Sequence, residues 1–438
     1  MDFPGFDPAR IARALALLDP GQGDQVDAYF ERLEEVEVQT GGPGPGLRCR
    51  RESGFAVRLE KPDQAWRVSA DGVDADQLRA AYRRVARVMP PTPPVFDGIA
   101  LPDWSTAPEA SELLQFPDRL LVALRERRAA LPLRLKLRRH LRQVQVIGPR
   151  LIASAEEEVF YSVAAELPGG RYGTLLADLD VAAAGALARA LAEQFRARDA
   201  PPPEPGPRVL VLAPAAAAVL LHEVVAHTLE ADNLALTGNP ASAIGVELGS
   251  PLLSLLDDPG NAPARVRRQA DDEGVPVRRR WLLRAGRVEE PLADRFWAER
   301  TGALQPGAAR RGSRHQAPSP RSSHLELLPG ATPAADLISQ AHGGLFVEEF
   351  ARGRLDPLAG TFAVEASCAR RIGTGGLGER VGRLRLRGRV ADLLAAVTAV
   401  GDEGRSGGAG WCAKEGQRLP VWATACGLRL EGVEVEPA

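Results

Sequence analysis

The chain has 438 residues, of which 45% are hydrophobic and 26% charged, and its formal net charge at pH 7 is −2. This composition is typical of a folded globular protein, and the balanced charge gives no reason to expect binding to nucleic acid. No run of 18 apolar residues marks a membrane span. A chain of this length is long for one hydrophobic core, so two domains are expected.

The first 200 residues predict a mixed α/β domain in which no catalytic chemistry is visible. Alternating apolar residues indicate strands, while amphipathic or alanine-rich stretches indicate helices. The expected helices cover residues 11–18, the stretch after Asp74 and residues 181–198, and the expected strands lie near 36–40, 55–59, 66–68, 143–147 and 159–165. We interpret domain 1–200 as a scaffold, a wall for the substrate and a dimer surface.

Two local patterns refine this first domain. Asp74 and Gln77 resemble a capping box for a helix whose Leu78 and Met89 lie on one face. The sequence GGPGPG at 41–46 predicts a loop between the first two strands.

A run of prolines separates the two halves of the chain. Residues 199–207 read DAPPPEPGP, which cannot form a helix and predicts a stiff, extended linker. A second domain is therefore expected over residues 208–438, rich in β structure and carrying the histidine-bearing helix described next. The predicted fold class is α+β with two domains.

The second domain opens with the segment that carries the most chemical information. Residues 208–212 read as a buried strand, Pro214 suits the first turn of a helix, and alanines and leucines continue it. His222, Glu223 and His227 then emerge from this apolar helix in the sequence HEVVAH. Two neutral imidazoles bind zinc, and a carboxylate accepts a proton from the zinc-bound water, which is the minimum for a hydrolytic site.

The spacing of the two histidines needs a local distortion of the helix. Residues five apart lie about 140° apart on an ideal α-helix, whereas the four-residue spacing of HExxH separates them by about 40°. His222 and His227 meet one ion if the helix is overwound, is widened by a π-type turn, or ends at His227. The alternative without a metal is that Glu223 and His227 form an ordinary i, i+4 pair.

The spacing leaves the third metal ligand open. Glu247 lies at a plausible distance along the chain for a glutamate ligand, whereas Glu230 and Asp232 crowd the helix that already supplies both histidines. The four cysteines form no CxxC pair, and no signal peptide is recognised. This pattern is typical of a reduced cytoplasmic protein.

A glycine-rich motif further along the chain matches a nucleotide-binding pattern only by chance. Residues 373–378 satisfy GxGxxG, the dinucleotide-binding pattern, which requires a helix to follow. The alternating residues 380–387 predict a strand instead, so we interpret the glycines as the tip of a hairpin.

Several segments in the second half resemble one known family. They are HEVVAHTLEADN from residue 222, DDEG at 271–274, ARRGSRHQAPSPR at 309–321, GGLFVEEFARGRLDPLAGTFAVEAS at 343–367 and WCAKEGQRLPV at 411–421. In this order they resemble the TldD/PmbA family of zinc metallopeptidases, historically labelled modulators of DNA gyrase. DQVDAYFERLEEVEV at 24–38 is similar to the family's opening strand.

The resemblance implies a role for several residues. Cys412 falls on the cysteine that the family uses as its third zinc ligand, beside His222 and His227, and a thiolate suits zinc. Glu223 is then the general base. His315 and Arg321 fall on family-like positions of the 309–321 loop, His315 as a catalytic donor to the oxyanion and Arg321 as a substrate-binding residue. This loop is one residue shorter than the family's and lacks its tyrosine.

The resemblance also implies a function. The expected activity is zinc-dependent hydrolysis of short or unfolded peptides by a cytoplasmic enzyme, acting as a homodimer or as a heterodimer with a family paralogue. The alternative is a non-catalytic peptide-binding or regulatory partner, like a gyrase modulator, in which the metal is structural.

Overall fold

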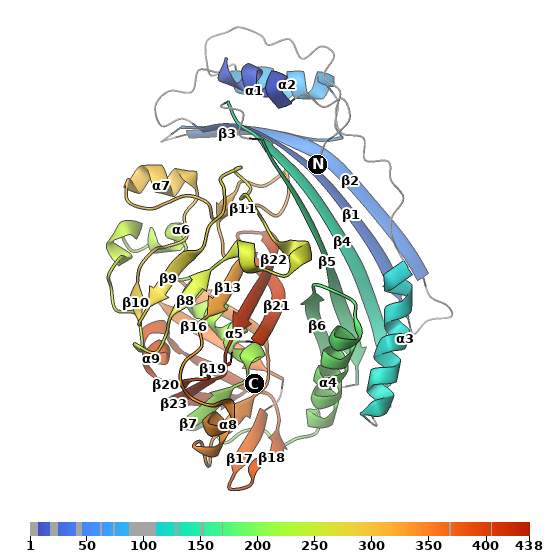
Figure 1. Cartoon of the computed structure of the whole chain (residues 1–438), viewed down its shortest axis with the longest axis vertical. Helices are drawn as coiled ribbons and strands as arrows, with labels where there is room; N and C mark the ends of the chain where they lie inside the picture. The colour runs from blue at the N-terminus through green and yellow to red at the C-terminus, as the bar shows by residue number, and fades with distance from the viewer. Residues whose placement is uncertain are drawn as a thin grey trace.

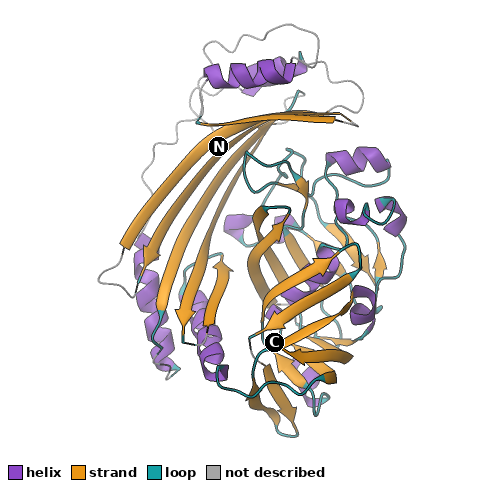
Figure 2. Ribbon diagram, turned by 180° about the vertical axis from the view of Figure 1, so that it is seen from behind, coloured by secondary structure: helices purple, strands orange, loops and turns teal. Residues whose placement is uncertain are grey.

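The computed structural model describes residues 8–17, 25–40, 46–61, 64–72, 75–86, 111–127, 129, 131–149, 153–168, 170–367, 369–403 and 405–438. A long, curved sheet from the N-terminal half arches beside a more rounded C-terminal body, as Figures 1 and 2 show from opposite sides. The chain is therefore a mixed α/β protein with a large sheet content. None of the helices in the described residues combines the length and apolar character needed to cross a membrane.

The curved sheet is antiparallel and contains six strands in the order β3-β2-β1-β4-β5-β6. These strands are β1 (Gln25–Gln39), β2 (Gly46–Lys61), β3 (Gln64–Asp71), β4 (Arg134–Ile147), β5 (Ala153–Leu167) and β6 (Gly170–Leu176). Long continuous pairing of β1 with β2 and with β4 makes the centre of the sheet a regular ladder. Successive side chains of such strands point to opposite faces.

Two pairs of helices cover one face of this sheet at its two ends. Helices α1 (Pro8–Ala16) and α2 (Ala75–Ala86) pack on one end, and α3 (Ser111–Glu126) and α4 (Val181–Ala197) pack on the other. Phe30 of β1 belongs to the first apolar cluster and Val38 to the second. These even-numbered residues of β1 share a face, so the strand's pleat sets which side the helices cover.

The opposite face of the sheet carries buried charges that contact the C-terminal body. Arg58 Nη2 lies 2.7 Å from Glu273 Oε1, and Arg142 Nη2 lies 3.1 Å from Asp272 Oδ1. All four side chains are buried. Buried ion pairs of this kind require close geometric matching, so they fix how the sheet sits on the body.

Most elements predicted for the N-terminal half are confirmed, although the strands are longer than expected. The strand predictions at 55–59 and 66–68 fall in β2 and β3, those at 143–147 and 159–165 fall in β4 and β5, and the one at 36–40 overlaps β1, which ends at Gln39. Helix α4 matches the helix predicted at 181–198 to within one residue. Helix α3 and strand β6 were not predicted. Residues 41–45, Asp74, Met89 and Cys368 lie outside the described residues.

The C-terminal body is built on two larger sheets. One has the order β10-β9-β8-β13-β22-β21 and the other the order β15-β16-β19-β23-β7-β14-β17-β18, with β20 paired to β23. The first contains β8 (Leu255–Asp257), β9 (Arg280–Arg284), β10 (Arg287–Val288), β13 (His324–Leu327), β21 (Arg405–Lys414) and β22 (Gln417–Ala425). The second contains β7 (Gly206–Leu212), β14 (Leu345–Val347), β15 (Phe350–Asp356), β16 (Thr361–Ala366), β17 (Ala369–Gly373), β18 (Gly376–Val381), β19 (Leu384–Arg389), β20 (Val397–Val400) and β23 (Leu428–Pro437).

Short elements complete this body. They are the helices α6 (Ala231–Leu234), α7 (Arg295–Thr301), α8 (Ala334–Ser339) and α9 (Val390–Ala395), and the two-stranded ribbon β11 (Ala309–Arg310) and β12 (Ser319–Pro320). The GxGxxG segment is the β17–β18 hairpin, which confirms the prediction that it is not a nucleotide loop. The single strand predicted at 380–387 is wrong in detail, because Gly382 and Arg383 separate β18 from β19.

Helix α5 (Pro214–Leu221) lies between the two sheets and positions the functional residues. It contacts β21 and β22 of one sheet and β15 of the other. Small residues on both elements allow this close approach, because a Cβ atom added at Gly408 of β21 would lie only 3.2 Å from Ala218 Cβ of α5. The helix is apolar all round and buried, as expected for a helix inside a core.

Candidate metal centre

The chain changes its helical winding at the first histidine. Helix α5 ends at Leu221, and residues His222–Ala226 form a π-helix that continues it. The backbone N–H of His227 donates to the carbonyl of His222 at 3.3 Å, an i→i+5 bond. This wider turn brings residues five apart onto neighbouring parts of the helix surface. Of the three distortions considered from the spacing, the structure contains the π-type turn, with His227 at its end.

Three side chains converge at this turn. The imidazoles of His222 and His227 lie with ring centroids 4.8 Å apart at an interplanar angle of 71°. Cys412 Sγ lies 3.3 Å from His227 Nε2. One ligand atom from each of the three residues falls within 4.8 Å of the others, and all three side chains are buried.

The donor set fits a zinc ion. His222 Nε2 is buried and has no hydrogen-bond partner among the described residues, which is costly unless another group binds it. Two imidazoles and one thiolate are ligands that zinc prefers, and three protein ligands leave a position open. The residues present therefore fit the metal that the chemistry implies.

The charges around the ligands favour a thiolate at Cys412. Burial by itself raises the pKa of the Cys412 thiol, but His227 and His222 beside it lower that pKa well below the usual range. Burial by itself lowers the pKa of His227, but the carboxylate of Glu230 and the sulfur of Cys412 raise it well above the usual range. The three side chains thus form a tightly coupled polar cluster inside an apolar core.

The tertiary structure brings Cys412 to the histidines from far along the chain. Cys412 lies on β21, at the edge of its sheet and against α5. Glu247, the alternative third ligand, is exposed and pairs with Arg287 at 3.0 Å, away from the histidines. The geometry therefore joins the cysteine, and not Glu247, to the two histidines.

Glu230 supports His227 from behind. Its carboxylate oxygens lie 3.0 and 3.1 Å from His227 Nδ1, so Nε2 is the nitrogen that faces Cys412. Lys414 Nζ lies 2.8 Å from Glu230 and 2.6 Å from Asp232. Burial by itself raises the pKa of Glu230, but His227 and Lys414 bring it down to about 2. A charged carboxylate behind a ligand histidine fixes the ring's tautomer and orientation.

Arg321 reaches the ligand cluster. Its side chain is fully buried, and its Nη1 lies 2.9 Å from Cys412 Sγ while its Nη2 donates to the carbonyl of Lys414 at 3.0 Å. Arg321 thus contacts a candidate metal ligand and is not among the residues that line the cleft, and its substrate-binding role stays a prediction.

His315 lies against the curved sheet. Its Nδ1 lies 3.1 Å from Ser69 Oγ and its Nε2 3.1 Å from Asp71 Oδ1, both on or beside β3 of the curved sheet. The buried side chain of Arg314 forms an ion pair with the exposed Asp71, and its backbone N–H donates to Glu31. These contacts hold the 309–321 loop against the N-terminal sheet, so His315 does not join the three ligands or line their cleft.

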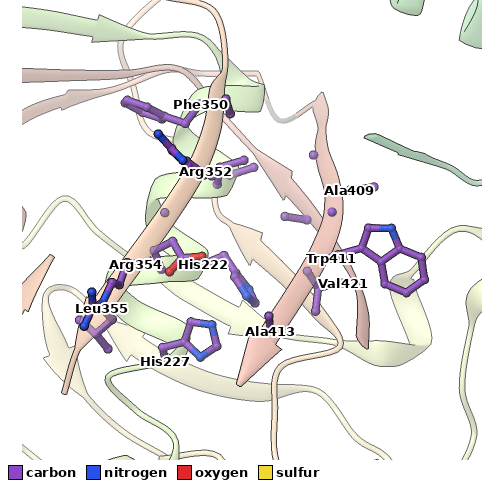
Figure 3. Close-up of a pocket in the computed structure, with 18 of the residues that line it drawn as sticks. His222, His227, Phe350, Arg352, Arg354, Leu355, Ala409, Trp411, Ala413 and Val421 are labelled. Atoms are coloured by element: carbon purple, nitrogen blue, oxygen red, sulfur yellow. The ribbon is translucent and has the colours of Figure 1, made fainter. Parts of the chain in front are cut away.

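The two histidines open onto a cleft of about 650 Å³. Consecutive residues Phe350–Leu355 of β15 line one side of it, and residues of β21 line the other, with α5 and the π-turn between them (Figure 3). Both β15 and β21 are the end strands of their sheets. The cleft is thus bordered by two strand edges whose backbone groups on the cleft side are not used by those sheets.

Gly353 of β15 makes room for Glu223. A Cβ atom added to Gly353 would lie 2.7 Å from Glu223 Cδ and would overlap its Cγ. The carboxylate of Glu223 therefore lies in a slot that only glycine leaves open. The slot places Glu223 in the same cleft as His222 and His227.

Sequence patterns had not identified several of these residues. Spacing disfavours Glu230 as a third metal ligand because it lies too close to the histidines, and no motif marks Lys414 or Gly353. A single glycine inside an alternating strand is a known sign of close approach by another group, and this was the only available signal for Gly353.

The sequence of the second half is similar to metallopeptidases. Residues 206–436 match the family model described as PmbA/TldA metallopeptidase C-terminal domain. The chain is 31% identical over 219 residues to a metalloprotease TldD homolog of Haemophilus influenzae, covering 50% of this chain and 45% of the relative. It is 30% identical over 293 residues to a metalloprotease of Synechocystis, covering 65% of this chain and 61% of the relative. The first of these matches thus spans a little under half of the relative's length.

Two solved structures share the fold along almost the whole chain. The structure of TldE from Thermococcus kodakarensis superposes with a TM-score of 0.74 at 16% identity, covering 97% of this chain and 99% of that one. A putative modulator of a DNA gyrase from Thermotoga maritima superposes with a TM-score of 0.73 at 16% identity, covering 98% and 99%. At this identity the likeness concerns the fold.

Proposed function

Because the chain belongs to the TldD/PmbA family of metallopeptidases, we propose that it is a zinc-dependent peptidase acting on short or unfolded peptides. The observation that carries the proposal is the convergence of His222, His227 and Cys412 beside a cleft that the two histidines and Glu223 line. We assign the three side chains as zinc ligands and Glu223 as the general base.

The protein's own residues have separate roles in the proposed reaction. Zinc, when bound, supplies a Lewis acid and lowers the pKa of a water molecule toward about 7. Glu223 takes the proton of the attacking water and later delivers it to the leaving amine. Glu230 holds His227 in the orientation and tautomer that present Nε2 to the ligand cluster.

The openness of the site supports catalysis over a structural metal. Structural zinc sites are closed by four protein ligands, whereas catalytic sites keep a position free. Two of the three candidate ligands, His222 and His227, line a cleft here, and the described residues offer no fourth His, Cys, Asp or Glu to the same group. This geometry favours the enzyme over a non-catalytic binding partner.

The two strand edges support an extended peptide as substrate. A peptide lying between β15 and β21 would add a strand to a sheet edge, because backbone groups there remain available. Main-chain pairing gives affinity with little dependence on side chains, which suits unfolded peptides of varied sequence. We further propose that the protein works in the cytoplasm as a homodimer or with a family paralogue, as the family resemblance implies.

Metal removal tests the proposal directly. Purified full-length protein should contain one zinc per chain and should cleave an unfolded test peptide. Chelation should abolish cleavage, and added zinc should restore it. A metal-loaded protein that binds the peptide without cleaving it would instead support the non-catalytic partner, and cleavage that survives complete zinc removal would refute a metal-dependent mechanism.

A further inference from the structure

A second carboxylate borders the cleft and has no cation beside it. Glu349, between β14 and β15, is partly buried and lines the same cleft as His222 and His227. Its only hydrogen bonds among the described residues come from Tyr172 of β6, whose hydroxyl lies 3.1 Å from both carboxylate oxygens. No Lys, Arg or His in the described part of the chain forms an ion pair with it.

The surroundings of Glu349 are unfavourable to its charge. Burial raises its pKa to about 7, and the neighbouring carboxylate of Glu348 adds to this effect. A partly buried carboxylate without a counter-charge is costly to keep ionised, and a cation placed beside it would relieve that cost. The mechanism proposed above does not use this group.

Glu349 also lies where the cleft continues into a second cavity. A cavity of about 720 Å³ adjoins the cleft, and the two share Glu349, Thr174 and Val219 in their walls. The open space beside Glu349 is thus continuous with the space beside the catalytic residues. A peptide long enough to leave the metal site in this direction passes the carboxylate.

The distance of Glu349 from Glu223 follows from the rise of the chain along β15. Gly353 lies against Glu223, and Glu349 precedes Gly353 by four residues, with a register shift between Phe350 and Arg352. At about 3.3 Å per residue this separation is about 10–13 Å. A peptide paired along the same strand edge has the same rise per residue, so its third or fourth residue from the scissile bond lies beside Glu349.

We propose that Glu349 and Tyr172 form a specificity subsite for a cationic group located three or four residues from the scissile bond of the peptide. The group is either the side chain of a lysine or arginine or the free α-amino group of a short peptide. The inference rests on the proposed peptidase function and names the substrate class of the same cleft: extended peptides with one positive charge at a fixed distance from the bond that is cut.

The test uses the zinc-loaded full-length protein and two sets of peptides. In the first set, a neutral peptide blocked at both ends carries one lysine, moved through five positions on each side of the cleaved bond, with glutamine as the reference. In the second set, short neutral peptides are compared with and without an acetylated amino terminus. The first set detects a side chain, and the second detects an α-amino group.

The expected result is a preference confined to one distance. A charged contact with a partly buried carboxylate corresponds to about a tenfold higher kcat/KM for the charged peptide. In Glu349→Gln, which keeps an acceptor for Tyr172, the ratio of charged to neutral peptide should fall to about one. Glu349→Lys should favour a peptide with glutamate at that position. Glu348→Gln is the matched control and should keep a preference at least as large as that of wild type, because Glu348 only disfavours the charge of Glu349.

Dissociation constants for the same peptides separate this inference from the peptidase proposal. They are measured on zinc-loaded Glu223→Gln protein, in which cleavage is blocked, and on Glu223→Gln/Glu349→Gln. If wild type cleaves no peptide but the charged peptides bind about tenfold more tightly through Glu349, the peptidase proposal fails and the subsite stands. Equal binding and cleavage of charged and neutral peptides, or a preference that survives Glu349→Gln, would overturn the subsite.

Discussion

Replacing Glu230 tests whether the second layer of the metal centre works as the geometry indicates. Glu230 is fully buried, contacts His227 Nδ1 through both oxygens, and is charged because its pKa is about 2. Glu230→Gln preserves the shape and one acceptor but removes the charge that holds the ring. His227 would then be less firmly oriented toward Cys412.

The size of the effect follows from these contacts. A hydrogen bond to a charged group contributes about 1.5–3 kcal/mol, and tenfold in affinity corresponds to about 1.4 kcal/mol. Loss of an outer carboxylate behind a ligand histidine typically weakens metal binding about 10–100-fold. We therefore expect the zinc Kd of Glu230→Gln to rise by about 10–100-fold, with hydrolysis recovered when zinc is saturating.

Competition with a chromophoric chelator measures this Kd at constant pH, after circular dichroism has shown that the variant is folded. Asp232→Asn is the matched control, because Asp232 contacts Lys414 and not His227. Its zinc Kd should stay close to that of wild type. An unchanged Kd in Glu230→Gln, or equal losses in the two variants, would refute the positioning role of Glu230.

Three other changes probe separate parts of the account. Cys412→Ala should lose zinc during dialysis while Cys426→Ala retains it, because Cys426 is buried away from the histidines; equal zinc in both would mean that the third ligand lies elsewhere. Gly353→Ala should retain zinc yet lower kcat at least about tenfold, since the added methyl displaces Glu223, and unchanged turnover would show that the slot is unimportant. Burial raises the pKa of Glu349 from 4.5 to about 7, so between these pH values the native state holds a proton that the unfolded chain releases. As the pH rises from 4.5 to 7, the free energy of unfolding should therefore fall by up to about 3 kcal/mol more in wild type than in Glu349→Gln. Parallel stability curves of the two proteins in denaturant titrations would contradict this.

Local patterns predicted the parts of the site that are local in the chain. His222, Glu223 and His227 lie within six residues, and their chemistry with the five-residue spacing already required a distorted helix. The π-turn is one of the distortions named in advance. The strands and helices with clear periodicity, such as α4 and β5, were also predictable for this reason.

Spacing along the chain does not identify Cys412 as a ligand. It joins the histidines because β21 packs on α5, a contact between segments far apart in sequence. Only family resemblance pointed to it. Spacing disfavours Glu230 as a third ligand because it crowds the helix that supplies both histidines, but in the fold its carboxylate contacts His227 Nδ1 and supports the ring.

Partners from other parts of the fold set the positions of His315 and Arg321. Arg314 pairs with Asp71 on the curved sheet and so carries His315 to the surface, while Arg321 turns inward to the sulfur of Cys412. Each outcome depends on a partner from another part of the fold. Sequence patterns show that such arginines exist but not which carboxylate or thiolate they meet.

In the proposed mechanism, Glu223 performs chemistry on a metal that the other residues hold. The most direct measurement compares zinc content and peptide hydrolysis in wild type and Glu223→Gln. Zinc per chain should be equal, because no ligand is changed, and hydrolysis should fall about 10²–10⁴-fold, because the proton acceptor is lost. A zinc-loaded variant that hydrolyses the peptide within a few-fold of wild type would contradict the account.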